Sequence, residues 1–316
     1  VSSGGEANMF AMRLARAFTR RSKILKFEGG YHGMSAEAQM SLAPNCLIDY
    51  PTSVADSAGI SRSIRDEILT APFNNLEVVQ SLIADHADQI AAIIVEPLQR
   101  IIQPIEGFLK GLRNECSKHG IVLIFDEIVT GFRLSYGGGQ ELYGVTPDLC
   151  TLGKIIGGGF PLAAIAGKKM IMDHFDERKV GRINTLMQVG TLSGNPVAST
   201  AGLKTLEILR RPGQYEKLRA NGNNLLSGIS MCLRQAGHTH KMVGDATLFD
   251  VIFTETPVLN YRDGLKADKT KAKKLNSYLR EQGILKAQNK MYISLALNEN
   301  DLSDTLAIFS ASALNL

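Results

Sequence analysis

The sequence predicts an α/β fold: a large domain with a mostly parallel sheet flanked by helices, followed by a smaller C-terminal α+β domain. Two observations predict it. Short apolar runs without polar alternation, typical of strands buried on both faces, occur at residues 24–27, 90–95, 121–125, 149–152 and 163–166. Helical patterns lie between several of these runs, and a strand, helix, strand order favours parallel strands joined by right-handed crossovers.

The first predicted helix lies near the N-terminus. Residues 1–6 have the pattern of a strand end that enters a tight turn. The apolar residues that follow recur on one face of a helix, at Ala7, Phe10, Ala11, Leu14, Ala15 and Phe18. We therefore expect a strand end, a glycine turn and a helix N-terminus, in that order.

Later elements are predicted by the same signals. Helices are expected at residues 75–85 and 108–119, the latter ended by a left-handed cap at Gly120. The clearest break in the chain, RRPG at residues 210–213, places a boundary between a large domain, residues 1–211, and a small domain, residues 212–316. The remaining predicted elements are helices at 193–209, 214–236 and 266–282 and strands at 249–253 and 291–295.

The composition limits the classes of function. Among 316 residues, 35 are Lys or Arg and 31 are Asp or Glu, and this net charge of +4 is too small and too dispersed to indicate nucleic-acid binding. The longest apolar stretch, residues 90–95, is far shorter than the roughly 20 residues that cross a bilayer, and no signal peptide pattern opens the chain. We expect a soluble, cytoplasmic protein that binds neither nucleic acid nor membranes.

Cysteine and histidine spacing argues against a metal centre. The four cysteines are far apart in the sequence and form no CxxC pair, and the six histidines form no HxxxH or HExxH pair. We interpret the cysteines as reduced thiols of a cytosolic protein. The cysteines are Cys46, Cys116, Cys150 and Cys232.

Residues with useful chemistry follow the predicted strands. In open parallel sheets, ligands bind at the carboxyl ends of the strands. Residues 3–5 could offer backbone N–H groups and a helix dipole to a phosphate, although an ordinary strand-to-helix turn would explain them as well. The other residues at these positions are Tyr31, His32, Glu96, Asp126 and Lys154.

Lys154 and Asp126 form the most informative pair. Lys154 stands between an apolar strand and a glycine-rich loop, where burial would favour the neutral amine and make it a nucleophile toward a carbonyl. A lone lysine is ordinarily a solvated surface group, so this hypothesis needs a partner. Asp126 ends an apolar strand, and a buried acid needs a cation to face. Its alternative, a cap on the next helix, is less favoured because residues 128–131 start no clean helical stripe.

Six segments in order resemble a known family. They are SSGGEANMFAMRLARAFTRR, FEGGYHG, IIVEPLQR, LIFDEIVTGFR, GVTPDLCTLGKIIGGGFPLAAIAG and VGTLSGNPVASTAGLKTLEIL. Together they resemble the class III aminotransferases of pyridoxal phosphate fold type I, and they are most similar to the glutamate-1-semialdehyde aminomutase branch. The resemblance runs almost from end to end of the chain.

The resemblance implies pyridoxal 5'-phosphate as the cofactor. Lys154 would form the Schiff base with its aldehyde and shuttle a proton, and Asp126 would pair with the pyridinium nitrogen. Thr191 would reach the phosphate bound by a neighbouring subunit, which implies a homodimer with shared sites. The other implied cofactor contacts are Ser3, Gly4 and Gly5 at the phosphate, Tyr31 with His32 beside it on one ring face, and Ile128 on the other. For His32 and Ile128, an ordinary loop histidine and a core residue remain alternatives.

The sequence departs from the family pattern in three ways. Gly5 replaces the usual Thr and removes a hydroxyl from the phosphate site, so we expect weaker cofactor binding. Val129 and Ser294 replace the Gln and Arg of ornithine-type members, which argues against the ornithine and GABA branches. The family pattern also extends upstream of Ser3, and we expect the chain to be a fragment of a longer protein.

We expect an aminotransferase that moves an amino group between an amino acid or amino-carboxylate and a keto acid or aldehyde. Glu96 and Arg100 are the candidate substrate-binding residues. Arg100 could bind a substrate carboxylate bidentately, although a surface ion pair explains it equally well. Residues 34–68 are predicted to form a lid that is more charged and less glycine-rich than the aminomutase branch carries.

Three alternatives stay open to different degrees. A glutamate-1-semialdehyde 2,1-aminomutase would use the same residues but return the amino group to the same carbon skeleton. An inactive relic that acts as a binding protein is disfavoured because Lys154 and Asp126 are both present. A nicotinamide oxidoreductase is disfavoured because the GxGxxG pattern is missing.

Overall fold

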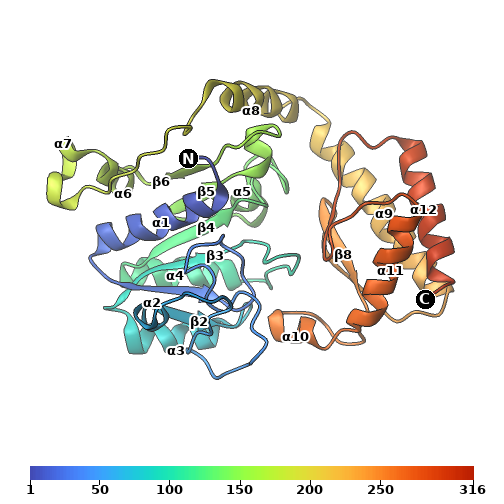
Figure 1. Ribbon diagram of the computed structural model, residues 1–316, viewed down its shortest axis with the longest axis horizontal. Helices are drawn as coiled ribbons and strands as arrows, with labels where there is room; N and C mark the ends of the chain where they lie inside the picture. Colours follow the sequence, from blue (N-terminus) through green and yellow to red (C-terminus); the bar gives the residue numbers. More distant parts are fainter. The chain divides into compact units, whose positions relative to one another are not determined.

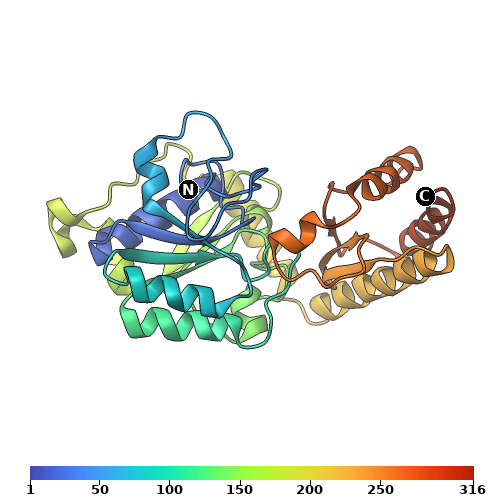
Figure 2. The same cartoon turned by 90° about the horizontal axis from the view of Figure 1, so that it is seen from below.

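The computed structural model describes residues 1–316, and the chain divides into two compact units. The large unit comprises Val1–Arg100 and Pro104–Ile208, and the small unit comprises Ile101–Gln103 and Leu209–Leu316. Figures 1 and 2 show their elements in two views. Every candidate site residue predicted from the sequence lies in the large unit.

The large unit is built on a six-stranded sheet in the order β2-β1-β3-β4-β5-β6. Its strands are β1 (Lys23–Phe27), β2 (Ile68–Ala71), β3 (Ile90–Val95), β4 (Val122–Glu127), β5 (Leu149–Leu152) and β6 (Ala164–Gly167). The first five strands are parallel, so their carboxyl ends meet at one edge. The sequence prediction missed β2, which falls at the end of the segment interpreted as a lid.

The last strand of the sheet runs against the others. The strand predicted at residues 163–166 corresponds to β6, which is antiparallel to β5, with Leu152 opposite Ala164. The connection contains only the short 3-10 helix η1 (Lys154–Gly157), and a parallel crossover needs a dozen or more residues. The chain therefore turns back directly beside β5.

Helices cover both faces of this sheet, with α1 on one face and α3 and α4 on the other (Figures 1 and 2). The helices of the unit are α1 (Gly4–Thr19), α2 (Arg62–Glu67), α3 (Leu76–His86), α4 (Phe108–His119), α5 (Gly138–Tyr143), α6 (Lys169–Met172), α7 (Glu177–Val180) and α8 (Pro196–Leu209). As predicted, α4 ends at Gly120, whose φ of 63° is left-handed. The strand end predicted at residues 1–6 is wrong, because α1 already begins at Gly4.

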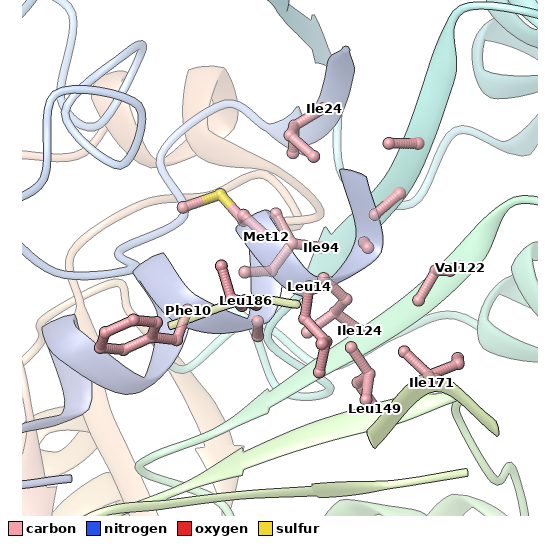
Figure 3. Packing of buried hydrophobic residues seen from close by; sticks show 14 of the residues in the cluster. Phe10, Met12, Leu14, Ile24, Ile94, Val122, Ile124, Leu149, Ile171 and Leu186 are labelled. Carbon is pink, nitrogen blue, oxygen red and sulfur yellow. The ribbon is translucent and has the colours of Figure 1, made fainter. Parts of the chain in front are cut away.

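The two sheet faces have separate cores. Figure 3 shows the α1 side, where Leu14 of α1 lies beside Ile94 and Ile124 in one buried cluster that also includes Phe10. Side chains alternate between the faces of a strand, so neighbouring strand residues point to the other side. There the rings of Phe27, Phe73 and Phe108 lie 5.0 to 5.9 Å apart, edge to face. Burying Leu14 completely contributes about 1.5–3 kcal/mol, so the apolar stripe read from the sequence is a major reason why α1 docks.

The small unit is an α+β arrangement. An antiparallel sheet of β7 (Lys241–Asp245), β8 (Leu248–Ile252) and β9 (Met291–Tyr292) accompanies α9 (Gln214–Gln235), α10 (Tyr261–Leu265), α11 (Lys269–Glu281) and α12 (Glu299–Ala313). The sequence prediction missed β7 and α12. The latter begins with a capping box between Asn298 and Asp301. No helix of the chain combines the length and apolar character of a membrane span.

Candidate active site

The carboxyl end of β4 carries a buried carboxylate at the parallel edge of the sheet. Asp126 is 3% exposed and belongs to the strand, one residue beyond its predicted end. Its Oδ2 faces His32 Nδ1 at 2.7 Å and accepts from Asn8 Nδ2 at 2.7 Å. Its Oδ1 accepts from the Ile128 N–H at 3.1 Å. The side chain is thus held in one orientation from three directions.

Asn8 and Thr151 complete this network, and the sequence prediction missed both. Asn8, on α1, also donates to the backbone carbonyl of His32 at 3.1 Å and accepts from Thr151 Oγ1 at 2.7 Å. Every polar group of the Asn8 amide therefore has a partner. Asn8 is a polar residue in the apolar pattern of α1, and Thr151 is one in the apolar strand β5. A polar residue within an apolar pattern is a signal that the sequence already contains.

The loop after β1 brings Tyr31 and His32 to this edge. The Tyr31 N–H donates to Glu96 Oε2 at 3.0 Å, and its ring is partly exposed. Because His32 Nδ1 faces a carboxylate, we assign its hydrogen to Nδ1. The buried Nε2 of His32 has no hydrogen bond within the chain. Nearby, the buried Gln99 donates to the carbonyl of Glu28 at 2.9 Å and fixes the start of the loop.

The first turn of α1 forms the next side of the site. Ser3 caps the helix, with its Oγ accepting from the Glu6 N–H at 3.2 Å. The N–H groups of Gly4 and Gly5 open the helix, where backbone donors have no intrahelical acceptor. A Cβ at Gly4 would lie 2.9 Å from Ile128, so the Ile128 side chain packs directly against this turn.

Lys154 begins η1, directly after β5, with a left-handed φ of 47°. Its side chain is exposed, whereas the sequence interpretation expected an amine among apolar groups. Surrounding protein still lowers the pKa of Lys154, and the positive charge of Arg100 lowers it further. Asp126 and Glu96 act in the opposite direction and raise the pKa. The expected pairing with Asp126 is therefore electrostatic and not a direct ion pair.

Arg100 lies over the ring of Tyr31. Its guanidinium carbon is 5.5 Å from the ring centroid, within the range of a cation–π contact. It forms no ion pair with a carboxylate of the chain, so the alternative of a surface ion pair is wrong. Glu96, by contrast, is buried and engaged by the Tyr31 N–H.

Two further predictions concern loops. Thr191 is exposed, and its side chain makes no hydrogen bond with the other candidate residues. In the segment 34–68, Glu37 and Glu67 both bind Arg16 of α1, at 3.2 and 3.3 Å. These two charges of the predicted lid are thus neutralised on the large unit.

Comparison with known proteins gives this arrangement its context. Residues 1–311 match the family model described as aminotransferase class III. The chain belongs to the class III aminotransferases. It is 42% identical to the glutamate-1-semialdehyde 2,1-aminomutase 2 of Brevibacillus brevis over 317 residues, which cover 97% of this chain and 71% of that protein.

Solved structures agree with this class III assignment. An omega-transaminase from Sphaerobacter thermophilus is 33% identical with a TM-score of 0.92, and a transaminase with bound PLP is 28% identical with a TM-score of 0.89. Each covers 100% of this chain, and the chain covers 73% of each. The predicted α/β fold of fold type I, the family and the pyridoxal phosphate cofactor are confirmed, and the chain is a PLP-dependent aminotransferase family member.

The residues present fit this cofactor. The carboxylate of Asp126 can accept a hydrogen bond from a protonated ring nitrogen. The backbone N–H groups at the N-terminus of α1, at Gly4, can bind a phosphate. The amine of Lys154, with its lowered pKa, suits an aldehyde. His32 Nε2 is a buried polar atom that still lacks a partner.

Proposed function

We propose that this class III enzyme is an intermolecular aminotransferase whose substrate carries a carboxylate. The observation that carries the proposal is Arg100, a half-buried guanidinium above Tyr31 with no carboxylate partner in the chain. Its planar group can bind a carboxylate through two parallel hydrogen bonds. An amino acid or amino-carboxylate donor and a keto acid or aldehyde acceptor both match such a site.

We assign the chemistry to two residues. Pyridoxal phosphate, when bound, supplies an aldehyde for amines and a ring that withdraws electrons. Lys154 supplies the amine that attaches the cofactor and then moves the proton at the reacting carbon of the substrate. Asp126 holds the proton on the ring nitrogen, while Asn8 and His32 orient it.

The remaining site residues position the cofactor in this proposal. Ser3, Gly4 and Gly5 hold the phosphate through the first turn of α1. Tyr31 and Ile128 would contact the two faces of the ring. The packing of Ile128 against Gly4 supports this, because it places an apolar surface beside the phosphate turn.

Reductive trapping tests the assignment of Lys154. Borohydride treatment of the loaded enzyme, followed by peptide mapping, should fix the cofactor on Lys154. The Lys154→Ala variant should retain no cofactor after reduction, and the exposed Lys169→Ala variant serves as the matched control. Trapping on another lysine would contradict the assignment.

The alternative activity is that of a glutamate-1-semialdehyde 2,1-aminomutase, which the 42% identity to such an enzyme favours. Incubation of the enzyme with glutamate-1-semialdehyde alone separates the two. Efficient formation of 5-aminolevulinate without added donor or acceptor would establish the aminomutase. Under our proposal, product appears only when an amino donor and a carbonyl acceptor are both supplied, and Arg100→Met raises the KM for the carboxylate substrate.

We further propose a homodimer in which each partner completes the other's site. Thr191 lies in a stretch that exposes many apolar side chains, and such patches are typical of subunit interfaces. These side chains are Ile183, Met187, Val189, Leu192, Val197 and Leu203. Analytical ultracentrifugation should give a dimer, and Thr191→Ala should weaken cofactor binding. A fully active monomer on dilution would contradict the proposal.

Two smaller proposals concern context. The four free cysteines support a cytoplasmic location, where thiols stay reduced. We also propose that residues 1–211 and 212–316 are the large and small domains of the class III fold, a boundary three residues beyond the division between the two compact units at Ile208 and Leu209. Limited proteolysis near residues 210–213 tests that boundary, because cleavage there should release two resistant fragments.

A further inference from the structure

Lys26 is a buried cation to which the proposed mechanism gives no role. It lies within β1 between two fully buried neighbours and is itself only 1% exposed. It forms no ion pair. Instead, its Nζ donates to the backbone carbonyls of Gly30 at 3.2 Å, Ala38 at 2.9 Å and Met40 at 2.5 Å. An ammonium has three N–H donors, so each of them has a partner here.

The three carbonyls belong to one segment, residues 30–40, which starts just after β1. Gly30 stands immediately before Tyr31 and His32, and the other two carbonyls lie near the far end of the segment. The Gly29 N–H donates to Ser41 O at 2.9 Å, and this hydrogen bond joins the two residues that flank the segment 30–40. The ammonium therefore joins both ends of the loop to the end of β1.

The position gives no packing reason for a charge. Its cross-strand neighbour on β2 is the uncharged Thr70, and a neutral side chain would avoid the cost of burying an ammonium. That burial lowers the pKa of Lys26 to about 7, an effect that the charges of Glu96 and Asp56 oppose and that of Arg100 increases. Burying this ammonium is energetically unfavourable, yet its three N–H groups all have carbonyl acceptors. This indicates that the hydrogen bonds to those carbonyls are needed.

We propose that Lys26 is a positioning residue: its ammonium closes residues 30–40 onto β1 and thereby holds Tyr31 and His32 where the cofactor ring binds. The inference rests on the cofactor roles proposed above for these two residues. It predicts that the loop is ordered before the cofactor arrives, which lowers the conformational cost of binding.

The experiment compares Lys26→Met with Lys23→Met. Both lysines lie on β1, but Lys23 reaches only one carbonyl, that of Asp66 at 2.9 Å, at an exposed position. Pyridoxal phosphate affinity is measured by fluorescence titration of the apo-protein, and amide hydrogen exchange is followed at residues 28–41. Lys26→Met should weaken the Kd about tenfold or more and speed exchange in this loop, since three buried acceptors lose their donors. Lys23→Met should match the wild type within about twofold.

The outcomes separate the possibilities. A Lys26→Met protein that is less stable globally, but whose Kd and loop exchange match the wild type, would overturn the proposal. If that variant does not fold, Lys26→Gln, which retains amide donors, should give intermediate values, and wild-type values in it would equally overturn the proposal. Failure of the wild type to bind pyridoxal phosphate would overturn the proposed function, whereas faster loop exchange in Lys26→Met would still support the positioning role.

Discussion

Asp126 and Glu127 are adjacent, buried carboxylates on the two faces of β4, and their surroundings differ. Asp126 is held by His32, which is 94 residues away in sequence, and by Asn8, which is 118 residues away. Glu127 accepts from Thr130 Oγ1 at 2.6 Å and from the N–H groups of Gly139 and Gln140 at 2.8 and 3.0 Å. All partners of Glu127 lie within 13 residues.

The difference shows how one strand end can serve two purposes. The side chain of Asp126 is oriented by elements that only the complete sheet brings together. Its orientation therefore depends on the tertiary structure. The side chain of Glu127 stabilises the local turn that leads into α5. Burial raises the pKa of Glu127, and its hydrogen bonds oppose that shift only in part. The proposed function gives the first carboxylate a chemical role, whereas the contacts of the second stabilise the fold.

The largest expected effect comes from Asp126→Asn. The neutral amide cannot hold the ring nitrogen protonated, so kcat should fall about a hundredfold or more while the enzyme still binds its cofactor. Steady-state kinetics and a cofactor titration check both parts. An unchanged kcat would remove Asp126 from the mechanism.

Glu127→Gln should reverse this pattern. One oxygen becomes an NH₂ group that faces backbone donors, which should cost about 1–3 kcal/mol of unfolding free energy and leave kcat within about twofold. Urea denaturation beside the same kinetic assay measures it. A loss of turnover at full stability would show that the two carboxylates are not separated in function.

The pH dependence sharpens the same contrast. Because the pKa of Glu127 is raised in the folded protein, the folded state binds the proton more tightly than the unfolded state. Wild-type stability relative to Glu127→Gln should therefore decrease as the pH rises above 4.5, the ordinary value for this group. Unfolding free energies of both proteins across pH 4 to 8 would test it, and a relative gain would contradict the assignment.

A smaller effect is expected for the side chains behind Asp126. Asn8→Leu removes one donor to the carboxylate and should lower kcat about tenfold. Thr151 Oγ1 lies 2.7 Å from Asn8 Oδ1 and 3.5 Å from Asp126 Oδ1, so it acts mainly through Asn8, and Thr151→Val should cost about twofold. The double variant should be no worse than Asn8→Leu alone, because one interaction depends on the other. Additive losses in this cycle would show that Thr151 acts by a separate route.

The smallest expected effect is a shift in the pKa of Lys154. Arg100 lowers that pKa and Glu96 raises it, so Arg100→Met should move the pH dependence of cofactor attachment upward and Glu96→Gln should move it downward. Both shifts should be small, because the charges involved are partly solvated. Spectroscopic pH titrations of the three proteins measure it, and shifts of the same sign would contradict the placement.

Much of the fold could be predicted because its strands are apolar and its helix ends are marked. The bounds of β3, β5 and α4 agree with their predictions. The direction of β6 could not be read, since an edge strand with small residues carries no signal for parallel or antiparallel pairing. The segment before β2 was interpreted as a lid because it follows the Tyr-His-Gly motif, where the aminomutase branch carries a loop. The sequence alone could not show that two of its charges, Glu37 and Glu67, bind Arg16 of α1.

Candidate site residues could be predicted where they directly follow a strand. Residues that orient a site residue by a hydrogen bond from another element could not. Tyr31, Asp126 and Lys154 stand at strand ends, and their roles stay proposals. Asn8 and Lys26 are polar residues within apolar patterns, and a pattern alone does not say which distant group such a residue meets. Only the packed sheet supplies that partner.

The start of α1 and the loop after β1 pack closely at two glycines, Gly5 and Gly33, and a Cβ fits at only one of them. Gly33 has a φ of 105°, and a Cβ there would come within van der Waals overlap of the Gly5 backbone. At Gly5, the nearest atom to an added Cβ would be 3.4 Å away, an ordinary contact. A Cβ at Gly5 therefore fits without moving the neighbouring loop, whereas any side chain at Gly33 would force the two segments apart.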